Sequence, residues 1–98
     1  MLILKPITFD WDKEKNLSNQ KKHGISFEEA QTVFVDENAL LIRDPDYSDE
    51  EDRFILLGLS VKLRILVVCH FYRKNDEIIR IISARKAERF EQKQYWER

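Results

Sequence analysis

The spacing of the hydrophobic residues changes near residue 39, and the chain before that point has the three- to four-residue spacing that is typical of helices. A short extended piece over residues 9–11 comes first. Asp12 is a favoured N-cap residue, and Gly24 suits the left-handed position that follows a helix end. We therefore predict the first helix over residues 13–23.

Two further helices are predicted from their end signals and their composition. Ser26 and Glu29 have the spacing of a capping box, so a second, shorter helix begins at this serine. Residues 85–98 are rich in helix-forming side chains and predict a C-terminal helix. The apolar stripe expected on the second helix consists of Phe27, Ala30, Val33 and Phe34.

After residue 39, aliphatic and β-branched residues form four strand-like runs. Short turns follow the second and the third run, so antiparallel hairpins are the simplest connections. The segment over residues 44–52, between the first two runs, is acidic and predicts a solvated loop. The four runs are residues 39–43, 53–60, 63–72 and 77–84.

The predicted order α-α-β-β-β-β-α indicates an α+β fold in which helices pack on a small, antiparallel four-stranded sheet. A chain of 98 residues is long enough for one domain and too short for two, so we expect residues 1–98 to form a single domain. The 43% of hydrophobic residues can supply its core.

The net charge of −1 conceals an uneven distribution of charge along the chain. Residues 1–50 contain 6 Lys and Arg residues against 11 Asp and Glu residues, whereas residues 51–98 contain 11 against 7. The basic second half can attract phosphate groups. The chain as a whole lacks the strong positive charge of a protein that coats nucleic acid without specificity.

Residue types and spacings exclude several kinds of site. The single cysteine, Cys69, lies in an apolar run, where we expect a buried thiol, and one cysteine forms no internal disulfide. No apolar run approaches the ~18 residues that span a bilayer, and the N-terminus lacks a signal-peptide pattern. Metal-ligand spacings and glycine-rich phosphate loops are missing from the sequence. We expect a cytoplasmic protein with no metal, no cofactor and no membrane contact.

Cleavage of RNA by its own 2′-hydroxyl group is a reaction that needs neither a metal nor a cofactor. It needs groups that transfer protons at two ribose oxygens, and cations around the charged phosphate. Histidine and arginine can supply both, and Tyr72 could stack on a base or donate a hydrogen bond. The candidates of these two types are His23, His70, Arg53, Arg80 and Arg85.

Several of these candidates also have an ordinary structural explanation. His23 lies in a cationic group at a helix end, where such charges interact well with the terminal carbonyls, and spacing alone favours this role over catalysis. His70 suits a half-buried position in a strand. Arg80 interrupts a run of isoleucines, and an ion pair at a sheet edge explains it as well as a function does.

Two separated motifs give the chain a family resemblance. The sequence KHGISFEEA follows the first helix, and RIISARKA precedes the last one, with DPD and DRF between them. In this order, and with a histidine near the end of the third strand, they resemble the BrnT toxins from about residue 9 to residue 95. The resemblance implies a RelE-like fold and an endoribonuclease toxin of a type II toxin–antitoxin system that inhibits translation. It also implies that a BrnA antitoxin neutralises the toxin. The antitoxin binds DNA, and the toxin would be linked to DNA only through it.

The resemblance carries over a set of motif positions. We expect proton transfer by His23 or His70, and we expect Arg80 and Arg85 to hold the phosphate. The remaining positions expected to bind RNA are Lys22, Arg53 and Ser83 from the motifs, together with Tyr72.

Two other functions remain open at this point. A helix–glycine–helix opening could belong to a helix-turn-helix protein that binds DNA, although its second helix would offer acidic side chains to the groove. A catalytically inactive module that only binds an antitoxin would keep the same fold and the same surface. Growth arrest with intact RNA would favour this inactive module.

Overall fold

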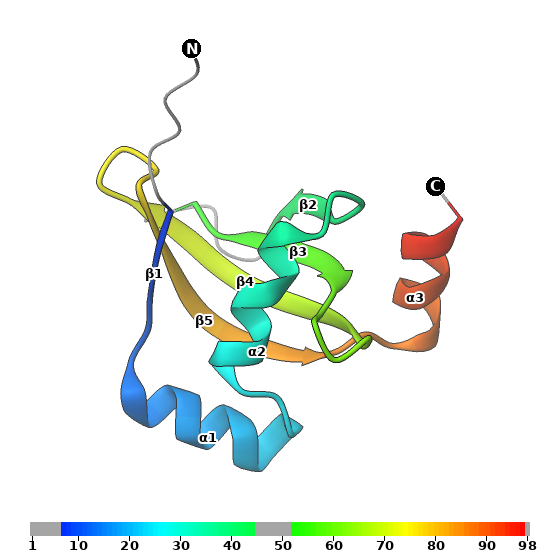
Figure 1. The fold of residues 1–98 in the computed structure, drawn as a ribbon, viewed down its shortest axis with the longest axis horizontal. Helices are drawn as coiled ribbons and strands as arrows, with labels where there is room; N and C mark the ends of the chain where they lie inside the picture. Colours follow the sequence, from blue (N-terminus) through cyan, green and yellow to red (C-terminus); the bar gives the residue numbers. More distant parts are fainter. Residues whose placement is uncertain (1–6, 45–51, 98) are drawn as a thin grey trace.

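The computed structural model describes residues 7–44 and 52–97, and a five-stranded sheet lies at its centre (Figure 1). Most of the acidic segment that was predicted as a solvated loop, residues 45–51, lies outside the described residues. The strands are β1 (Thr8–Asp10), β2 (Leu40–Arg43), β3 (Phe54–Leu59), β4 (Ile65–Arg73) and β5 (Ile78–Lys86). The helices are α1 (Lys13–His23), α2 (Phe27–Gln31), the 3-10 helix η1 (Thr32–Val35) and α3 (Arg89–Trp96).

The sheet has the strand order β1-β5-β4-β3-β2, and β1 makes the prediction of a wholly antiparallel, four-stranded sheet wrong. β1 runs parallel to β5, with Asp10 opposite Arg80, whereas the other neighbouring strands are antiparallel as predicted. A three-residue strand shows no period of its own, and its partner lies near the other end of the chain, so no local signal reveals the pairing. In this detail the sheet also departs from the RelE-like arrangement that the resemblance implied.

The predicted end signals of α1 are present in the structure. Asp12 Oδ1 accepts hydrogen bonds from the backbone N–H groups of Glu14 at 2.8 Å and Lys15 at 3.1 Å, and these bonds lower the pKa of Asp12. Gly24 follows the helix with a φ of 72°, a left-handed conformation that costs glycine little. The first helix is therefore confirmed over residues 13–23.

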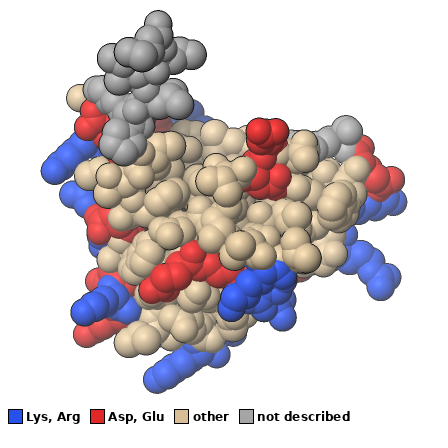
Figure 2. All heavy atoms as spheres, viewed as in Figure 1, with Lys and Arg blue, Asp and Glu red and all other residues tan. Residues whose placement is uncertain are grey.

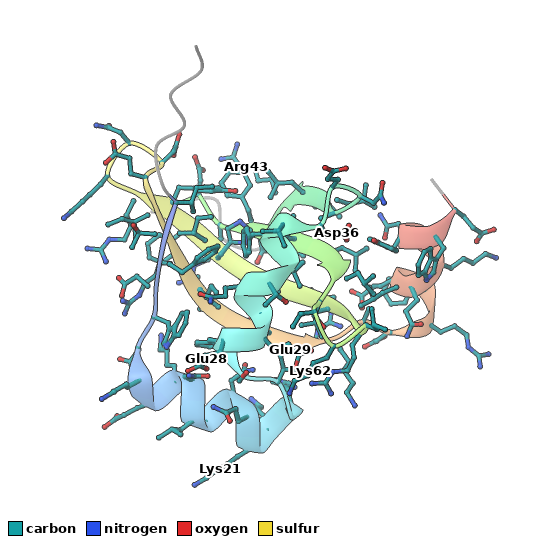
Figure 3. The ribbon with its side chains drawn as sticks, in the orientation of Figure 1. Lys21, Glu28, Glu29, Asp36, Arg43 and Lys62 are labelled. Atoms are coloured by element: carbon teal, nitrogen blue, oxygen red, sulfur yellow. The ribbon has the colours of Figure 1, made fainter. Side chains whose placement is uncertain are left out.

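Glu29 joins α2 to the turn between β3 and β4. Ser26 Oγ accepts from the Glu29 N–H at 3.0 Å, as the capping box predicts, but the Glu29 carboxylate accepts from Ser60 Oγ at 2.7 Å and pairs with Arg64. Burial opposes ionisation of this carboxyl group, yet the bonds from Arg64 and Ser60 hold the pKa of Glu29 below its usual value. Figure 3 shows Glu29 beside Lys62 of the turn, whose charge acts in the same direction.

Both faces of the sheet are covered, each by different helices. α1, α2 and η1 lie over the face that carries Leu66 and Val68, both fully buried, and α3 packs through Tyr95 on the opposite face, against Ile65 and Val67 (Figure 1). In β4 the alternate residues Ile65, Val67, Cys69 and Phe71 are all apolar or cysteine, a sequence pattern that favours the second of these faces as the core. The structure buries the first face more deeply, because the longer helical segment covers it.

The C-terminal helix begins later than the sequence predicted. The pairing of β5 with β4 continues as far as Lys86, and the Ala87 N–H then donates to the Ile65 carbonyl at 2.8 Å. Residues 85 and 86 are therefore strand, and α3 begins at Arg89.

Candidate functional site

A pocket of about 390 Å³ opens on the α3 side of the sheet, where β3, β4 and β5 meet the end of α1. We call it the His23 pocket. It brings together four residues that the sequence analysis proposed as functional: His23, Arg53, Ser83 and Arg85. The other lining residues are Asp44, Ile55, Val67, Cys69, Ile82 and Ala84.

Asn19 holds α1 against β5 and so places His23 at the pocket. Its side-chain amide donates to the carbonyls of Ala84 and Ile25, both at 2.8 Å, and its oxygen accepts from the Ala84 N–H at 3.2 Å. β1 pairs only with residues 78–80 of β5, so the backbone edge near Ala84 is open to a side chain. His23 follows Asn19 by about one helical turn and therefore lies next to this part of β5.

An irregularity in the pairing of β4 and β5 gives the pocket its β5 residues. Cys69 lies opposite Ser83, whereas His70 lies opposite Ile81, so Ile82 is an extra residue in β5. An extra residue changes the alternation of side chains along the strand. As a result Ile81 and Ala84 both pack in the core beneath α1 and α2, and Ser83 and Arg85 reach the pocket on the other face.

Arg85 enters the pocket in a fixed orientation. Its two terminal nitrogens donate to the two carboxylate oxygens of Glu91 on α3, each at 2.8 Å. This two-bond geometry is the one that guanidinium groups also use with phosphate. The hydrogen bonds from Arg85 lower the pKa of Glu91, and the same bonds raise the pKa of Arg85. A phosphate that binds Arg85 must therefore share it with Glu91 or displace that carboxylate.

The cysteine in the pocket wall is unsuited to act as a nucleophile. Burial raises the pKa of the Cys69 thiol, and Asp44 raises it further despite the opposing charge of Arg53. The thiol lies 3.8 Å from Asp44 Oδ2, to which it donates. The backbone N–H of Asp44 donates to the Arg53 carbonyl at 2.8 Å, and this bond ties the two chain segments together at the pocket.

His70 and Tyr72 lie outside this pocket. The His70 ring is fully buried on the face that α1, α2 and η1 cover. Its Nδ1 lies 3.2 Å from the Val68 carbonyl, and its Nε2 lies 3.2 Å from the Tyr72 hydroxyl. Burial lowers the pKa of His70 to about 4, which keeps the ring neutral. The two histidines, either of which was expected to transfer a proton, therefore lie at different places, because the register of β4 turns His70 toward Phe34 of η1.

Arg80 and Lys22 are also not among the residues that line the His23 pocket. Arg80 donates to Asp10 Oδ2 at 2.8 Å across the pairing of β5 with β1, which is an ion pair of the kind that the sequence pattern allowed for it, although β5 is not an edge strand here. Lys22 is exposed on the last turn of α1 beside His23. Arg80 and Arg85, which were expected to hold the phosphate together, therefore lie at different parts of β5, because Asp10 binds Arg80 outside the pocket.

A family model described as the ribonuclease toxin BrnT of type II toxin–antitoxin systems matches residues 11–91. The chain belongs to the BrnT family. The matched residues include every residue that lines the His23 pocket. The resemblance that the KHG and RIISAR motifs indicated is therefore confirmed.

This BrnT-family chain also resembles a solved structure in its fold. The crystal structure of the Brucella abortus ribonuclease toxin BrnT matches with a TM-score of 0.64 and 24% sequence identity, over 85% of this chain and 99% of the other. No curated protein matches the chain. The mixed arrangement of helices on a sheet is thus shared with a BrnT toxin.

Asp44 is a charged residue of the His23 pocket that sequence reasoning missed. It opens the acidic segment that was predicted to be solvated, yet its side chain is buried in the pocket wall. Its position directly after a strand run was the available signal, since residues at strand ends often enter sites.

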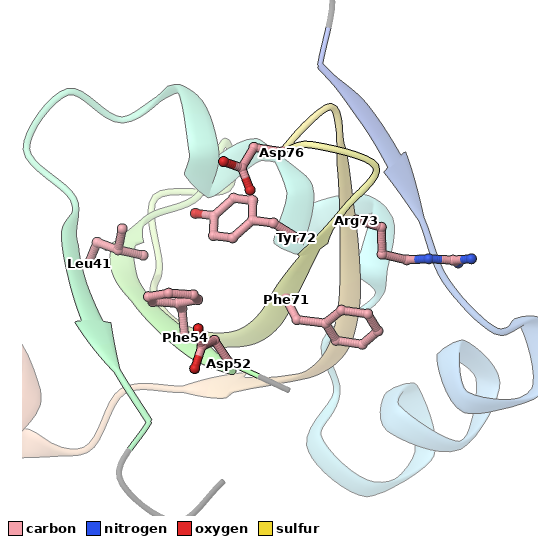
Figure 4. A pocket seen from close by; sticks show the side chains of 7 residues that line it. All are labelled: Leu41, Asp52, Phe54, Phe71, Tyr72, Arg73 and Asp76. Atoms are coloured by element: carbon pink, nitrogen blue, oxygen red, sulfur yellow. The ribbon is translucent and has the colours of Figure 1, made fainter. Parts of the chain in front are cut away.

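A larger pocket, of about 670 Å³, lies at another part of the sheet in this BrnT-family structure (Figure 4). Its lining includes the rings of Phe54, Phe71 and Tyr72 together with Asp52, Asp76, Leu41 and Arg73. Arg73 pairs with Asp10 at 3.2 Å, and two carboxylates oppose an anion there. This pocket is therefore less suited to phosphate than the His23 pocket.

Within residues 7–44 and 52–97, no three His, Cys, Asp or Glu side chains form a group that could hold a metal ion. Over the same ranges no helix is long and apolar enough to cross a membrane.

Proposed function

We propose that this chain is an endoribonuclease that cleaves RNA in the His23 pocket without a metal ion. The 2′-oxygen of a ribose forms a bond to the adjacent phosphorus, and the bond from phosphorus to the 5′-oxygen breaks. The products are a 2′,3′-cyclic phosphate and a 5′-hydroxyl group. The observation that carries the proposal is the convergence of one imidazole and two guanidinium groups from separate chain segments on one pocket.

In this reaction His23 transfers a proton at one of the two ribose oxygens. Arg53 and Arg85 neutralise the charge that grows on the phosphate, and the Ser83 hydroxyl donates to one of its oxygens. The second proton is exchanged with water, because Ser83 at the mouth of the pocket is exposed to solvent. Lys22, beside His23, attracts the phosphates of the neighbouring nucleotides.

His70, Arg80 and Tyr72 have other roles in this proposal. The His70 imidazole is buried among aromatic rings away from solvent, so it exchanges no proton with a substrate. Arg80 joins β5 to β1 through Asp10, and the Tyr72 hydroxyl bonds to His70.

We propose in addition that RNA cleavage by this chain inhibits translation and that a BrnA-like antitoxin neutralises it. The family description as a type II toxin supports a protein antitoxin. The acidic first turn of α2 supports the view that DNA is contacted only by the antitoxin, since the exposed Glu28 would repel a phosphate backbone.

Cleavage of a defined RNA by the purified chain tests this function. We expect products with 2′,3′-cyclic phosphate ends, equal rates with and without EDTA, and a loss of rate of roughly 100-fold or more in His23→Ala and Arg85→Ala. Arg80→Ala is the matched control for the second variant and should keep its rate, because it removes a guanidinium group that lies outside the pocket.

Three results contradict the proposal. One is full activity in His23→Ala, and another is loss of activity on chelation. The third is growth arrest by the wild-type chain while cellular RNA stays intact, which would favour the inactive module that only binds its antitoxin.

A further inference from the structure

The four most exposed large hydrophobic side chains among the described residues lie around the turn between β3 and β4. Val35, Val61, Leu63 and Trp96 are 82%, 70%, 79% and 65% exposed. Val35 and Val61 line one groove and Leu63 and Trp96 line a second, and Leu59 lines both grooves. We call these five residues the Leu63 surface. Figure 1 shows the turn between the α2–η1 segment and α3, and Figure 2 shows a broad uncharged area on the same face of the molecule.

The backbone conformation of Leu63 shows that the turn does not need a leucine. Its φ is 61°, in the left-handed region, which favours glycine and asparagine and is strained for a branched apolar side chain. The turn between β4 and β5 uses the same region with polar residues, at Lys74, Asn75 and Asp76. Leu63 is also almost fully exposed, so it contributes little to the core. The fold itself therefore gives no reason for a leucine at this position, whereas contact with another molecule does.

The charges around the Leu63 surface indicate which kind of molecule fits it. Lys86 lines the groove of Leu63 and Trp96, together with Arg64, which is paired with Glu29. Among the described residues the lining of this groove contains no carboxylate, and Lys62 lies between the two exposed turn residues. In the other groove, the Asp36 carboxylate already accepts from the Leu59 N–H at 2.8 Å and from the Tyr95 hydroxyl at 2.6 Å. A matching partner therefore has apolar side chains with carboxylates beside them.

The exposed aliphatic groups distinguish a protein from RNA as the partner. Valine and leucine side chains offer no flat face on which a base can stack, whereas they pack well against the apolar stripe of an amphipathic helix. The His23 pocket has a different lining, which shares none of the described residues with either groove. The surface is therefore separate from the residues to which we assign RNA cleavage.

We propose that the Leu63 surface is the docking site for the antitoxin, which places an apolar helix stripe flanked by Asp or Glu side chains over the β3–β4 turn. This inference rests on the antitoxin that the proposed function includes, but not on the mechanism of cleavage. The apolar side chains supply most of the affinity, and Lys62 and Lys86 orient the partner.

Calorimetric titration with the purified protein encoded beside this toxin's gene tests the inference in the absence of RNA. Leu63→Asn and Val61→Ser should each weaken binding by roughly 10- to 100-fold, because each removes a side chain that the complex buries. Leu63→Asn should fold at least as stably as the wild type, since asparagine tolerates the left-handed conformation. Leu17→Asn is the matched control, since Leu17 is a leucine of 61% exposure on α1, and its affinity should stay unchanged.

A parallel RNA cleavage assay separates a failure of this inference from a failure of the proposed function. Both surface variants should cleave RNA at the wild-type rate while resisting the antitoxin. Unchanged antitoxin affinity in both variants would overturn the inference, whether or not the chain cleaves RNA. A wild-type dimer that Leu63→Asn converts to monomer would assign the surface to a second copy of the chain, and weaker RNA binding in that variant would assign it to RNA.

Discussion

Lowering the pH from 7.5 to 5.0 should destabilise this chain through one residue, His70. The ring is buried beneath α1, α2 and η1, and this burial lowers its pKa from 6.5 to about 4. The unfolded chain therefore binds a proton at His70 more readily than the folded chain does. The stabilising contribution of the neutral ring is complete above pH 6.5 and is lost as the pH falls toward 4.

The size of this effect follows from the two pKa values. Each pKa unit corresponds to about 1.4 kcal/mol, so the full contribution is about 3 kcal/mol, and about 2 kcal/mol of it is lost by pH 5. Other groups contribute in a lower window. Glu29 and Glu91 have pKa values below the ordinary 4.5, so their stabilising contributions decline only as the pH falls below that value. The range between pH 7.5 and pH 5 therefore isolates the histidine.

Urea denaturation followed by tryptophan fluorescence at pH 7.5 and pH 5.0 measures this loss. His70→Leu should be less stable than the wild type at pH 7.5, because it leaves the Tyr72 hydroxyl without its ring partner, but it should lose most of the pH dependence. His23→Gln, a change at the other histidine, should keep the wild-type dependence. Equal wild-type stability at the two pH values would refute the reasoning, as would an undiminished pH dependence in His70→Leu.

Two further changes test the packing and the pocket. Glu91→Gln keeps the length of the side chain but removes the charge that competes with RNA phosphate for Arg85. The KM for RNA should therefore fall by about fivefold, and the control variant Glu97→Gln should leave the KM unchanged. A higher KM in Glu91→Gln would instead mean that Glu91 positions the arginine for its substrate. Gly58→Ala should lower the free energy of unfolding, measured by urea denaturation, by about 1–3 kcal/mol, because the added Cβ would lie 2.6 Å from Val33 Cγ1. A decrease below about 0.5 kcal/mol would contradict this close packing.

The features that sequence alone predicted well depend on neighbouring residues. The ends of α1 follow from Asp12 and Gly24, whose side-chain and backbone properties act within one turn. The stripe on α2 and η1 follows from helical spacing, and Phe27 and Val33 are buried as expected. The antiparallel pairing of β3, β4 and β5 follows from their short turns.

The features that the sequence did not reveal depend on residues far apart in the chain. The parallel pairing of β1 with β5 brings Asp10 to Arg80, and no local pattern distinguishes this ion pair from a phosphate-binding arginine. The extra residue Ile82 in β5 decides which side chains reach the pocket, and it is visible only in the register with β4. The same register turns His70 fully into the core, whereas the sequence pattern favoured a half-buried position.

The short helix α3 shows why even correct secondary structure leaves a site unassigned. Its composition predicted a helix, but three of its residues contact three different parts of the molecule. Glu91 bonds to Arg85 in the His23 pocket, Tyr95 donates to Asp36 near the end of η1, and Trp96 belongs to the Leu63 surface. Since one eight-residue helix contacts both the pocket and the proposed docking site, a partner that binds Trp96 touches the element that holds Arg85. An antitoxin on this surface therefore need not enter the pocket in order to affect the arginine.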